Sequence, residues 1–190
     1  LNDPLYRAVA WQALYEGGLH KKVKGEFFLK LCIKHLPQEK NNLVVNRTLS
    51  FLRIIYSTYL DEGSRQLIQD DLERFCINMV NNKAEGKNKK SYFNTLLSIC
   101  SSPKSCSYLS SVLKGEQDLP EDVTINEHDK ISIAFNLVLR DTNVYEDMKA
   151  YIMKTVKNKD LLDRFEYVYP SLSGDKYVRD SVFNALLVRE

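Results

Sequence analysis

The sequence contains few of the residues that break helices and form tight turns. Glycine occurs seven times and proline five times in 190 residues, about half the share usual in soluble proteins. This scarcity argues against a β-sandwich or barrel, which needs many turns. The longest stretch without a charged residue, 91–103, is shorter than the ~18–20 residues that cross a bilayer. No membrane span is therefore expected.

Recognisable signatures of catalysis are also missing. The glycines match neither the GxGxxG nor the P-loop pattern of phosphate-binding loops. His20, His35 and His128 include no pair four residues apart, so the HExxH zinc motif is absent. The serine-rich stretch 98–111 lacks a nucleophile elbow, and its serines are expected on a solvent-facing surface or at helix caps. The residues alone predict no catalytic residue and no metal ligand, and they indicate a helical packing or binding module.

Apolar residues recur at helical spacing along the whole chain, and no alternating strand pattern persists. The pattern predicts about ten helices of about 10–18 residues. Before residue 150, five helix starts are marked by capping residues: Asp3-Pro4, Ser64, Ser102-Pro103, Asn126 with Asp129, and Asn143 with Glu146. The acidic cluster around His128 is interpreted as one of these capped starts rather than a metal site. Gly17-Gly18 is expected to end the first helix.

The predicted fold class is all-α. Short loops make successive helices antiparallel neighbours, and helix pairs with wide apolar faces must stack on one another. We therefore expect an irregular α-solenoid of about ten antiparallel helices, similar to HEAT or armadillo proteins, in a single helical domain over residues 1–190. No strict repeat period is visible.

The cysteines and lysines do not point to a metal site, a redox site or a strongly basic surface. None of the four cysteines forms a CxxC pair, and we expect buried reduced thiols. The net charge is only +2, which gives no general attraction to nucleic acid. Two lysine clusters are expected in solvated loops, although they leave a helical nucleic-acid binder open as an alternative; they comprise Lys21, Lys22 and Lys24, and Lys83, Lys87, Lys89 and Lys90.

The last thirty residues contain a distinctive pattern. Residues 160–173 read DLLDRFEYVYPSLS, and they lead through Asp175 into the sequence VRDSVF at 178–183. This pattern resembles the C-terminal helical domain of the M1-family zinc aminopeptidases, which include aminopeptidase N and the endoplasmic-reticulum aminopeptidases. The segment YRAVAWQALY at 6–15 and the dipeptide Arg140-Asp141 also resemble parts of that domain.

The resemblance implies a HEAT-like domain that closes over the zinc active site of an upstream catalytic domain and walls a peptide chamber. The zinc ligands, the glutamate base and the Gly-x-Met-Glu-Asn motif of the family belong to another domain. This chain should therefore bind no cofactor and have no enzymatic activity of its own. Because it begins without Met and the family domain usually continues, we expect a fragment of a longer peptidase with an exposed apolar edge. Its compartment is not predicted.

Structural roles can be assigned to the residues that match the family pattern. Pro170 should force a corner after the helix containing Phe165, and Ser173 should cap the next helix, which contains Phe183. Arg179 and Asp180 are expected to pair with Asp163 or Arg164 across this corner. As an alternative, Arg164 or Arg179 faces the chamber and binds a peptide carboxylate.

The primary hypothesis is therefore a non-catalytic lid and chamber wall whose partners are the upstream catalytic domain and peptide substrates, with neither nucleic acid nor a membrane span. The alternative is a free-standing HEAT-like scaffold for protein interaction.

Overall fold

The computed structural model describes residues 2–82 and 88–187 of the chain, and helices account for all of the regular structure there. The prediction of an all-α fold is confirmed. The described residues form ten α-helices: α1 (Pro4–Leu19), α2 (Gly25–His35), α3 (Asn42–Ile54), α4 (Glu62–Val80), α5 (Lys89–Ile99), α6 (Pro103–Lys114), α7 (Glu127–Arg140), α8 (Tyr145–Thr155), α9 (Lys159–Val168) and α10 (Lys176–Leu187). Shorter helical turns are η1 (Leu36–Gln38), η2 (Ile55–Tyr59), η3 (Thr142–Val144) and η4 (Tyr169–Leu172).

The chain divides into two compact units. Unit 1 contains residues up to 105 together with 119–124, and unit 2 contains 106–118 and the residues from 125 onward. The boundary falls inside α6. The single domain and the solenoid arrangement expected from the sequence stay predictions.

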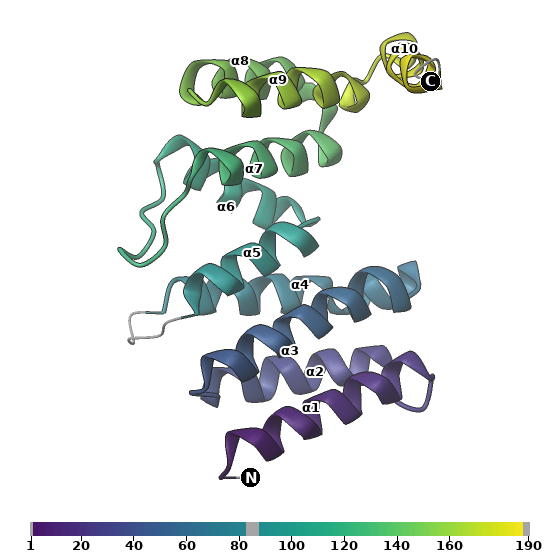
Figure 1. Ribbon diagram of the computed structural model, residues 1–190, viewed down its shortest axis with the longest axis vertical. Coiled ribbons are helices and arrows are strands. Elements are labelled where there is room, and N and C mark those ends of the chain that lie inside the picture. The colour runs from purple at the N-terminus through teal and green to yellow at the C-terminus, as the bar shows by residue number, and fades with distance from the viewer. Residues whose placement is uncertain (1, 83–87, 188–190) are drawn as a thin grey trace. The chain divides into compact units, whose positions relative to one another are not determined.

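Unit 1 is built from α1 to α5, and its consecutive helices run in alternating directions (Figure 1). Helices α1, α2 and α3 contact one another, while α4 packs against α5 and α2. The core between them is mostly apolar, and Phe28, Leu52, Leu72 and Phe93 are completely buried in it. Burial of such side chains supplies most of the folding free energy.

Unit 2 contains α7 to α10 and the greater part of α6. Helix α7 packs against α8 and η4, and η4 contacts both α9 and α10. The centre of this unit is an aromatic cluster in which Phe165 stacks at 5.7 Å from Phe135 and lies 4.4 Å from Tyr169, ring centroid to ring centroid. Tyr145 stacks on the other side of Tyr169 at 4.5 Å. Such ring pairs add stability beyond the area that they bury.

Three of the predicted helix starts are confirmed. The Asp3 carboxylate accepts from the Leu5 backbone N–H at 2.7 Å, and Ser102 Oγ accepts from the Ser105 N–H at 3.2 Å. Asn126 and Asp129 form a reciprocal capping box at the start of α7. Each side chain satisfies a backbone donor that has no partner within the helix.

The other two predicted starts were wrong by a few residues. Asp61 rather than Ser64 caps α4, and its carboxylate accepts from the Ser64 N–H at 2.8 Å. Asp141 rather than Asn143 begins the next turn, because its carboxylate accepts from the Asn143 N–H at 3.0 Å and leads into η3, so that α8 begins at Tyr145. In both places an aspartate two or three residues upstream provides the charged acceptor, which binds backbone N–H groups more strongly.

The first helix also ends later than predicted. Helix α1 continues through Gly17 and Gly18 to Leu19, and the chain reverses at Lys21, whose φ is 58°. Gly17 lies against Val23, where a Cβ atom would come within 2.7 Å of Val23 Cγ2. Close packing, rather than helix termination, therefore explains this glycine.

Candidate functional site

The corner predicted at Pro170 is present in unit 2. Helix α9 ends at Val168, Pro170 lies in η4, and α10 begins at Lys176. Phe165 is buried on the inner side of this corner and Tyr169 is completely buried beside it. The Tyr169 hydroxyl donates to the Tyr145 carbonyl oxygen at 2.7 Å. Burial raises the pKa of Tyr169, so the hydroxyl remains a donor over the whole physiological range.

The polar residues of the corner take different partners from those expected. Arg179 donates from Nη1 to the Ser173 carbonyl oxygen at 2.5 Å, and no ion pair joins Arg179 or Asp180 to Asp163 or Arg164. Ser173 Oγ accepts from the Asp175 N–H, and the Asp175 carboxylate accepts from the Tyr177 N–H at 2.8 Å. Asp175 therefore occupies the capping position that we assigned to Ser173, again because a carboxylate is the stronger acceptor.

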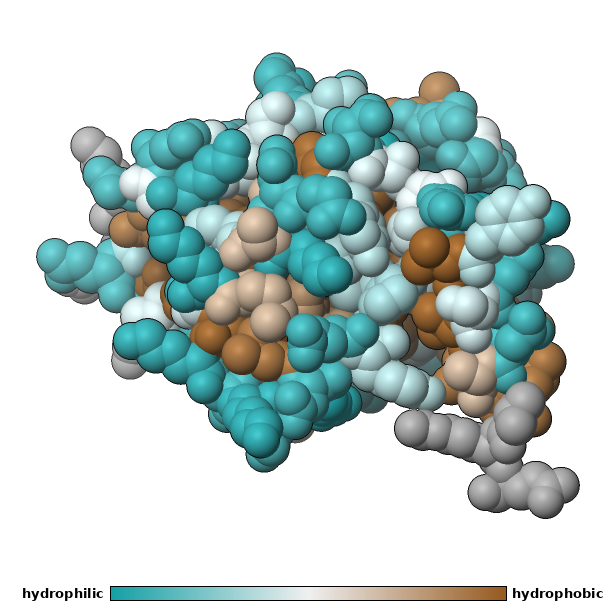
Figure 2. Space-filling model, turned by 90° about the horizontal axis from the view of Figure 1, so that it is seen from above, coloured by the Kyte–Doolittle hydropathy of each residue, from teal (hydrophilic) through white to brown (hydrophobic). Residues whose placement is uncertain are grey.

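Arg164, Arg179 and Asp180 are all exposed. Phe183 is also exposed, at 62%, together with other apolar residues of α10: Tyr177, Leu186 and Leu187. Figure 2 views the molecule from the side of α8 to α10, where hydrophobic atoms interrupt a largely hydrophilic surface. The corner thus combines a buried aromatic cluster with a helix, α10, whose apolar side chains are exposed. Arg164 and Arg179 do not form a shared site there.

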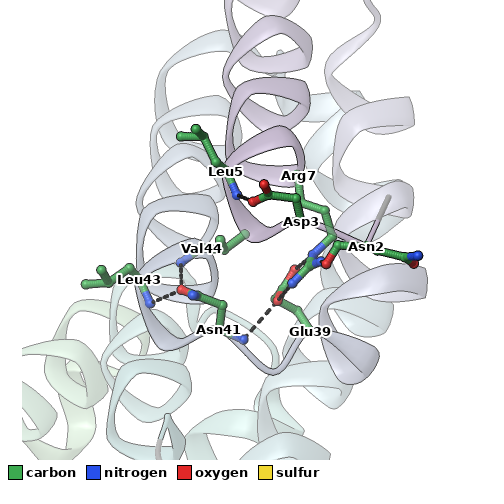
Figure 3. Close-up of polar contacts among 8 residues, drawn as sticks. All are labelled: Asn2, Asp3, Leu5, Arg7, Glu39, Asn41, Leu43 and Val44. Carbon is green, nitrogen blue, oxygen red and sulfur yellow. Dashed lines mark hydrogen bonds and ion pairs between the residues drawn. The ribbon is translucent and has the colours of Figure 1, made fainter.

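Unit 1 contains a polar contact that the sequence did not reveal. Arg7 on α1 forms a bidentate ion pair with Glu39, which lies just after η1 (Figure 3). Nε donates to Oε2 at 2.7 Å and Nη2 donates to Oε1 at 2.8 Å. Glu39 Oε1 also accepts from the Asn41 N–H at 2.8 Å, and the Asn41 side chain in turn caps α3. Arg7 therefore ties α1 to the connection that starts α3.

The electrostatics of this pair favour its charged form. The hydrogen bond from Arg7 lowers the pKa of Glu39, although burial of the carboxylate opposes the shift. The same hydrogen bond raises the pKa of Arg7. A guanidinium facing a carboxylate in two-pronged geometry is among the stronger hydrogen-bonded pairs in proteins. The pair is therefore a fixed feature of the surface of unit 1.

A cavity of about 700 Å³ lies beside this ion pair. It is lined by α1, by α2 and by the segment 38–40. Apolar side chains and polar side chains both contribute to its wall: Ala10, Trp11, Leu14 and Leu31 are apolar, and Asn2, Arg7, His35, Gln38, Glu39 and Lys40 are polar. Its size falls in the range of small-molecule sites.

A second carboxylate missed by sequence reasoning is Glu73 on α4, which is 1% exposed. Its Oε1 accepts from the backbone N–H groups of Ser101 at 2.7 Å and Ser102 at 3.2 Å. Its Oε2 accepts from the Ser102 hydroxyl. Glu73 thus fixes the connection between α5 and α6.

Glu127 does the same in unit 2. Its carboxylate accepts from the backbone N–H groups of Lys157 at 2.7 Å and Asn158 at 3.2 Å, in the connection between α8 and α9. Glu39, Glu73 and Glu127 therefore each bind the backbone of an interhelical connection. Local sequence patterns cannot reveal this role for Glu73 and Glu127, because their backbone donors lie about thirty residues away.

Lys21, Lys22 and Lys24 of the first lysine cluster are exposed, whereas two lysines of the second cluster contact other residues of unit 1. Lys89 pairs with Asp122 at 3.1 Å, and Lys90 donates to the Thr124 carbonyl oxygen at 2.9 Å while its Nζ lies 5.1 Å from the centre of the Phe93 ring. Lys83 and Lys87, which belong to the same predicted cluster, lie outside the described residues. Two of the lysines are thus used within unit 1.

Across residues 2–82 and 88–187, no helix has both the length and the apolar character needed to cross a membrane. Over the same residues, no three His, Cys, Asp or Glu side chains are grouped as metal ligands. His128 lies at the capped start of α7, as interpreted from the sequence.

No family model, curated protein or solved structure matches the chain.

Proposed function

We propose that this chain is the non-catalytic C-terminal helical domain of a zinc aminopeptidase of the M1 family, where it closes over the active site and walls the peptide chamber. The observation on which this proposal rests is the sequence pattern of residues 160–183, from the Phe165 helix through Pro170 to Phe183. In that family the zinc ligands lie in a separate catalytic domain, so this chain acts by shaping access to a reaction centre elsewhere.

Two structural features support the proposal. The first half of the pattern packs as a structural motif would, since Phe165 is buried, Pro170 makes the corner and α10 follows it, whereas Phe183 in the second half is exposed. The second matching segment, 6–15, forms most of α1, and its Arg7 is the ion-pair partner of Glu39. Both matching segments therefore contribute contacts between helices, as expected of a structural domain.

The proposal is tested by the reading frame that encodes the chain. An upstream HExxH motif with a downstream glutamate, together with a Gly-x-Met-Glu-Asn motif, is the expected result. A frame without these motifs contradicts the proposal. As a second test, the isolated chain should hydrolyse no aminoacyl chromogenic substrate above the blank. Turnover that survives chelation and repurification also contradicts it.

A free-standing scaffold is the second candidate, and the exposed apolar residues of α10 favour it. Tyr177, Phe183 and Leu187 are each more than 60% exposed, and apolar surface of this kind marks interaction sites. The reading frame distinguishes the two candidates, because a scaffold requires no upstream catalytic domain.

A further inference from the structure

The cavity beside Arg7 and Glu39 has a divided lining. Its apolar wall comes from one face of α1 and from Leu31 on α2, while its polar side chains come from the first residues of the chain and from the segment around η1. Its volume of about 700 Å³ is large enough for a small organic molecule, one side of which would stay open to solvent. An apolar wall with a few convergent polar groups is the usual composition of a small-molecule site.

The charge balance of the lining favours an anion. Glu39 contributes the cavity's carboxylate, and its two oxygens already accept from Arg7 Nε, Arg7 Nη2 and the Asn41 N–H. The charges of Arg7 and Glu39 therefore compensate each other. His35 and Lys40 also line the cavity, and neither has an ion-pair partner among the described residues. Among the charged side chains of the lining, Lys40 therefore supplies a positive charge that no ion pair compensates.

The apolar wall is preorganised. The Trp11 ring stands edge-on to the completely buried Phe28, with ring centroids 5.8 Å apart and an interplanar angle of 83°. Leu14 and Leu31 are only partly buried, so each retains surface that a ligand can cover. A wall held in place before binding lowers the entropic cost of association.

We propose that this cavity binds a small carboxylic acid with an apolar body. The carboxylate lies toward Lys40 and His35, and the apolar body covers Trp11, Leu14 and Leu31. A neutral apolar molecule would gain nothing from the positive charge of Lys40, whereas a dicarboxylate would place its second charge against the apolar wall or against Glu39. This site is distinct from the proposed lid function and does not depend on it.

The single tryptophan of the chain provides a direct reading of the site, because Trp11 lines the cavity. We would titrate the full 190-residue chain with N-acetyl-L-leucine while recording tryptophan emission, and follow the single indole N–H signal by NMR. The expected result is a saturable change in both signals, with binding about three- to tenfold weaker for N-acetyl-L-leucinamide, which lacks the charge. Added salt should weaken binding of the acid but not of the amide.

Variants locate the carboxylate. Lys40→Ala, at an exposed position, should weaken binding of the acid by about three- to tenfold and leave binding of the amide unchanged. Lys34→Ala is the matched control, because it removes an exposed lysine of α2 that does not line the cavity. The proposal is overturned if neither signal changes, if the amide binds as well as the acid, or if Lys34→Ala weakens binding as much as Lys40→Ala.

Two further probes distinguish the source of the carboxylate. The peptide acetyl-Ala-Ala-Leu presents it at a chain end, and 4-methylpentanoate presents it on a free acid with a similar apolar body. Tighter binding of either one supports the site and identifies the source. Failure of both to bind, with N-acetyl-L-leucine also inactive, overturns it.

Discussion

The hydroxyl of Tyr169 donates to the backbone carbonyl oxygen of Tyr145 at 2.7 Å, across 24 residues of sequence. The rings of the same two residues stack at 4.5 Å. One side chain thus supplies both the apolar contact and the polar contact that hold η4 against the start of α8. The cluster around Pro170 is therefore more than a patch of buried rings, because its position is fixed by a directional bond.

Replacing Tyr169 with Phe tests the directional part of this contact. The substitution keeps the ring but leaves the Tyr145 carbonyl without this donor, so we expect a loss of about 1–2 kcal/mol of unfolding free energy. Urea unfolding followed by circular dichroism measures it. Tyr177→Phe is the control, because Tyr177 is 85% exposed and should change stability by less than about 0.5 kcal/mol. Equal effects at both positions would show that the hydrogen bond contributes nothing.

Glu73 offers a second test of polar anchoring. Glu73→Gln places an amide group where backbone N–H groups already point, and at 1% exposure water cannot compensate. We expect a loss of about 2–4 kcal/mol, measured by urea unfolding. Glu166→Gln, at an exposed position within α9, should be nearly neutral. A Glu73→Gln protein as stable as the parent would contradict the anchoring role.

The stability of unit 1 should depend on pH through Glu39. Its pKa is lowered in the folded state by the hydrogen bond from Arg7. A carboxyl with a depressed folded pKa contributes stability that is fully present above its unfolded value of about 4.3 and is lost as the pH falls through the folded value. Unfolding followed by Trp11 emission should therefore show stability falling with pH below this value.

Glu39→Gln should make that acid dependence less steep while lowering stability near neutral pH; part of the slope should remain, because hydrogen bonds from Ser64 also lower the pKa of Glu26 and Asp61. Glu166→Gln serves as the control and should retain the slope of the parent chain. If Glu39→Gln and the parent lose stability in parallel below about pH 4.3, the Arg7–Glu39 pair is not the source of the dependence.

Two glycines provide a matched pair for packing. A Cβ at Gly25 would lie 2.6 Å from Leu60 Cδ2 and 3.2 Å from Ile55 Cγ2, and both partners are buried. Gly25→Ala should therefore cost about 1–3 kcal/mol. At Gly63 the nearest atom is Asp61 Oδ1 at 3.4 Å, an ordinary contact.

Gly63→Ala should accordingly leave stability unchanged or raise it by up to about 1 kcal/mol, because alanine loses less conformational entropy in a helix. Thermal unfolding of the two variants side by side measures the contrast. A Gly25→Ala protein as stable as Gly63→Ala would mean that Leu60 moves aside without cost.

The helices were predictable from the sequence because their signals are local. Asp3, Ser102 and Asn126 lie within three residues of the N–H groups that they cap, and the all-α prediction required only the spacing of apolar residues. Ser64 and Asn143 were misassigned because Asp61 and Asp141, just upstream, compete for the same donors. Local patterns identify helix starts to within a few residues, and the choice between neighbouring acceptors depends on their charge.

The polar contacts of the candidate sites were not predictable in the same way. Arg7 and Glu39 are 32 residues apart, and Glu73 and Ser101 are 28 apart. The sequence around each residue does not identify its partner, because these contacts form only when the helices pack together. The expected pairing of Arg179 and Asp180 with Asp163 or Arg164 was wrong for a different reason, because the nearby Ser173 carbonyl oxygen accepts from Arg179.

The four cysteines differ in how far packing covers their thiols. Cys32, Cys76 and Cys100 are buried as expected, whereas Cys106 is partly accessible. Burial raises the pKa of Cys32 and Cys76 and so suppresses their thiolate forms. An alkylating dye would consequently attach first at Cys106 in the native protein. The slow labelling rate of the three buried thiols would then report how often unit 1 opens transiently in the absence of denaturant.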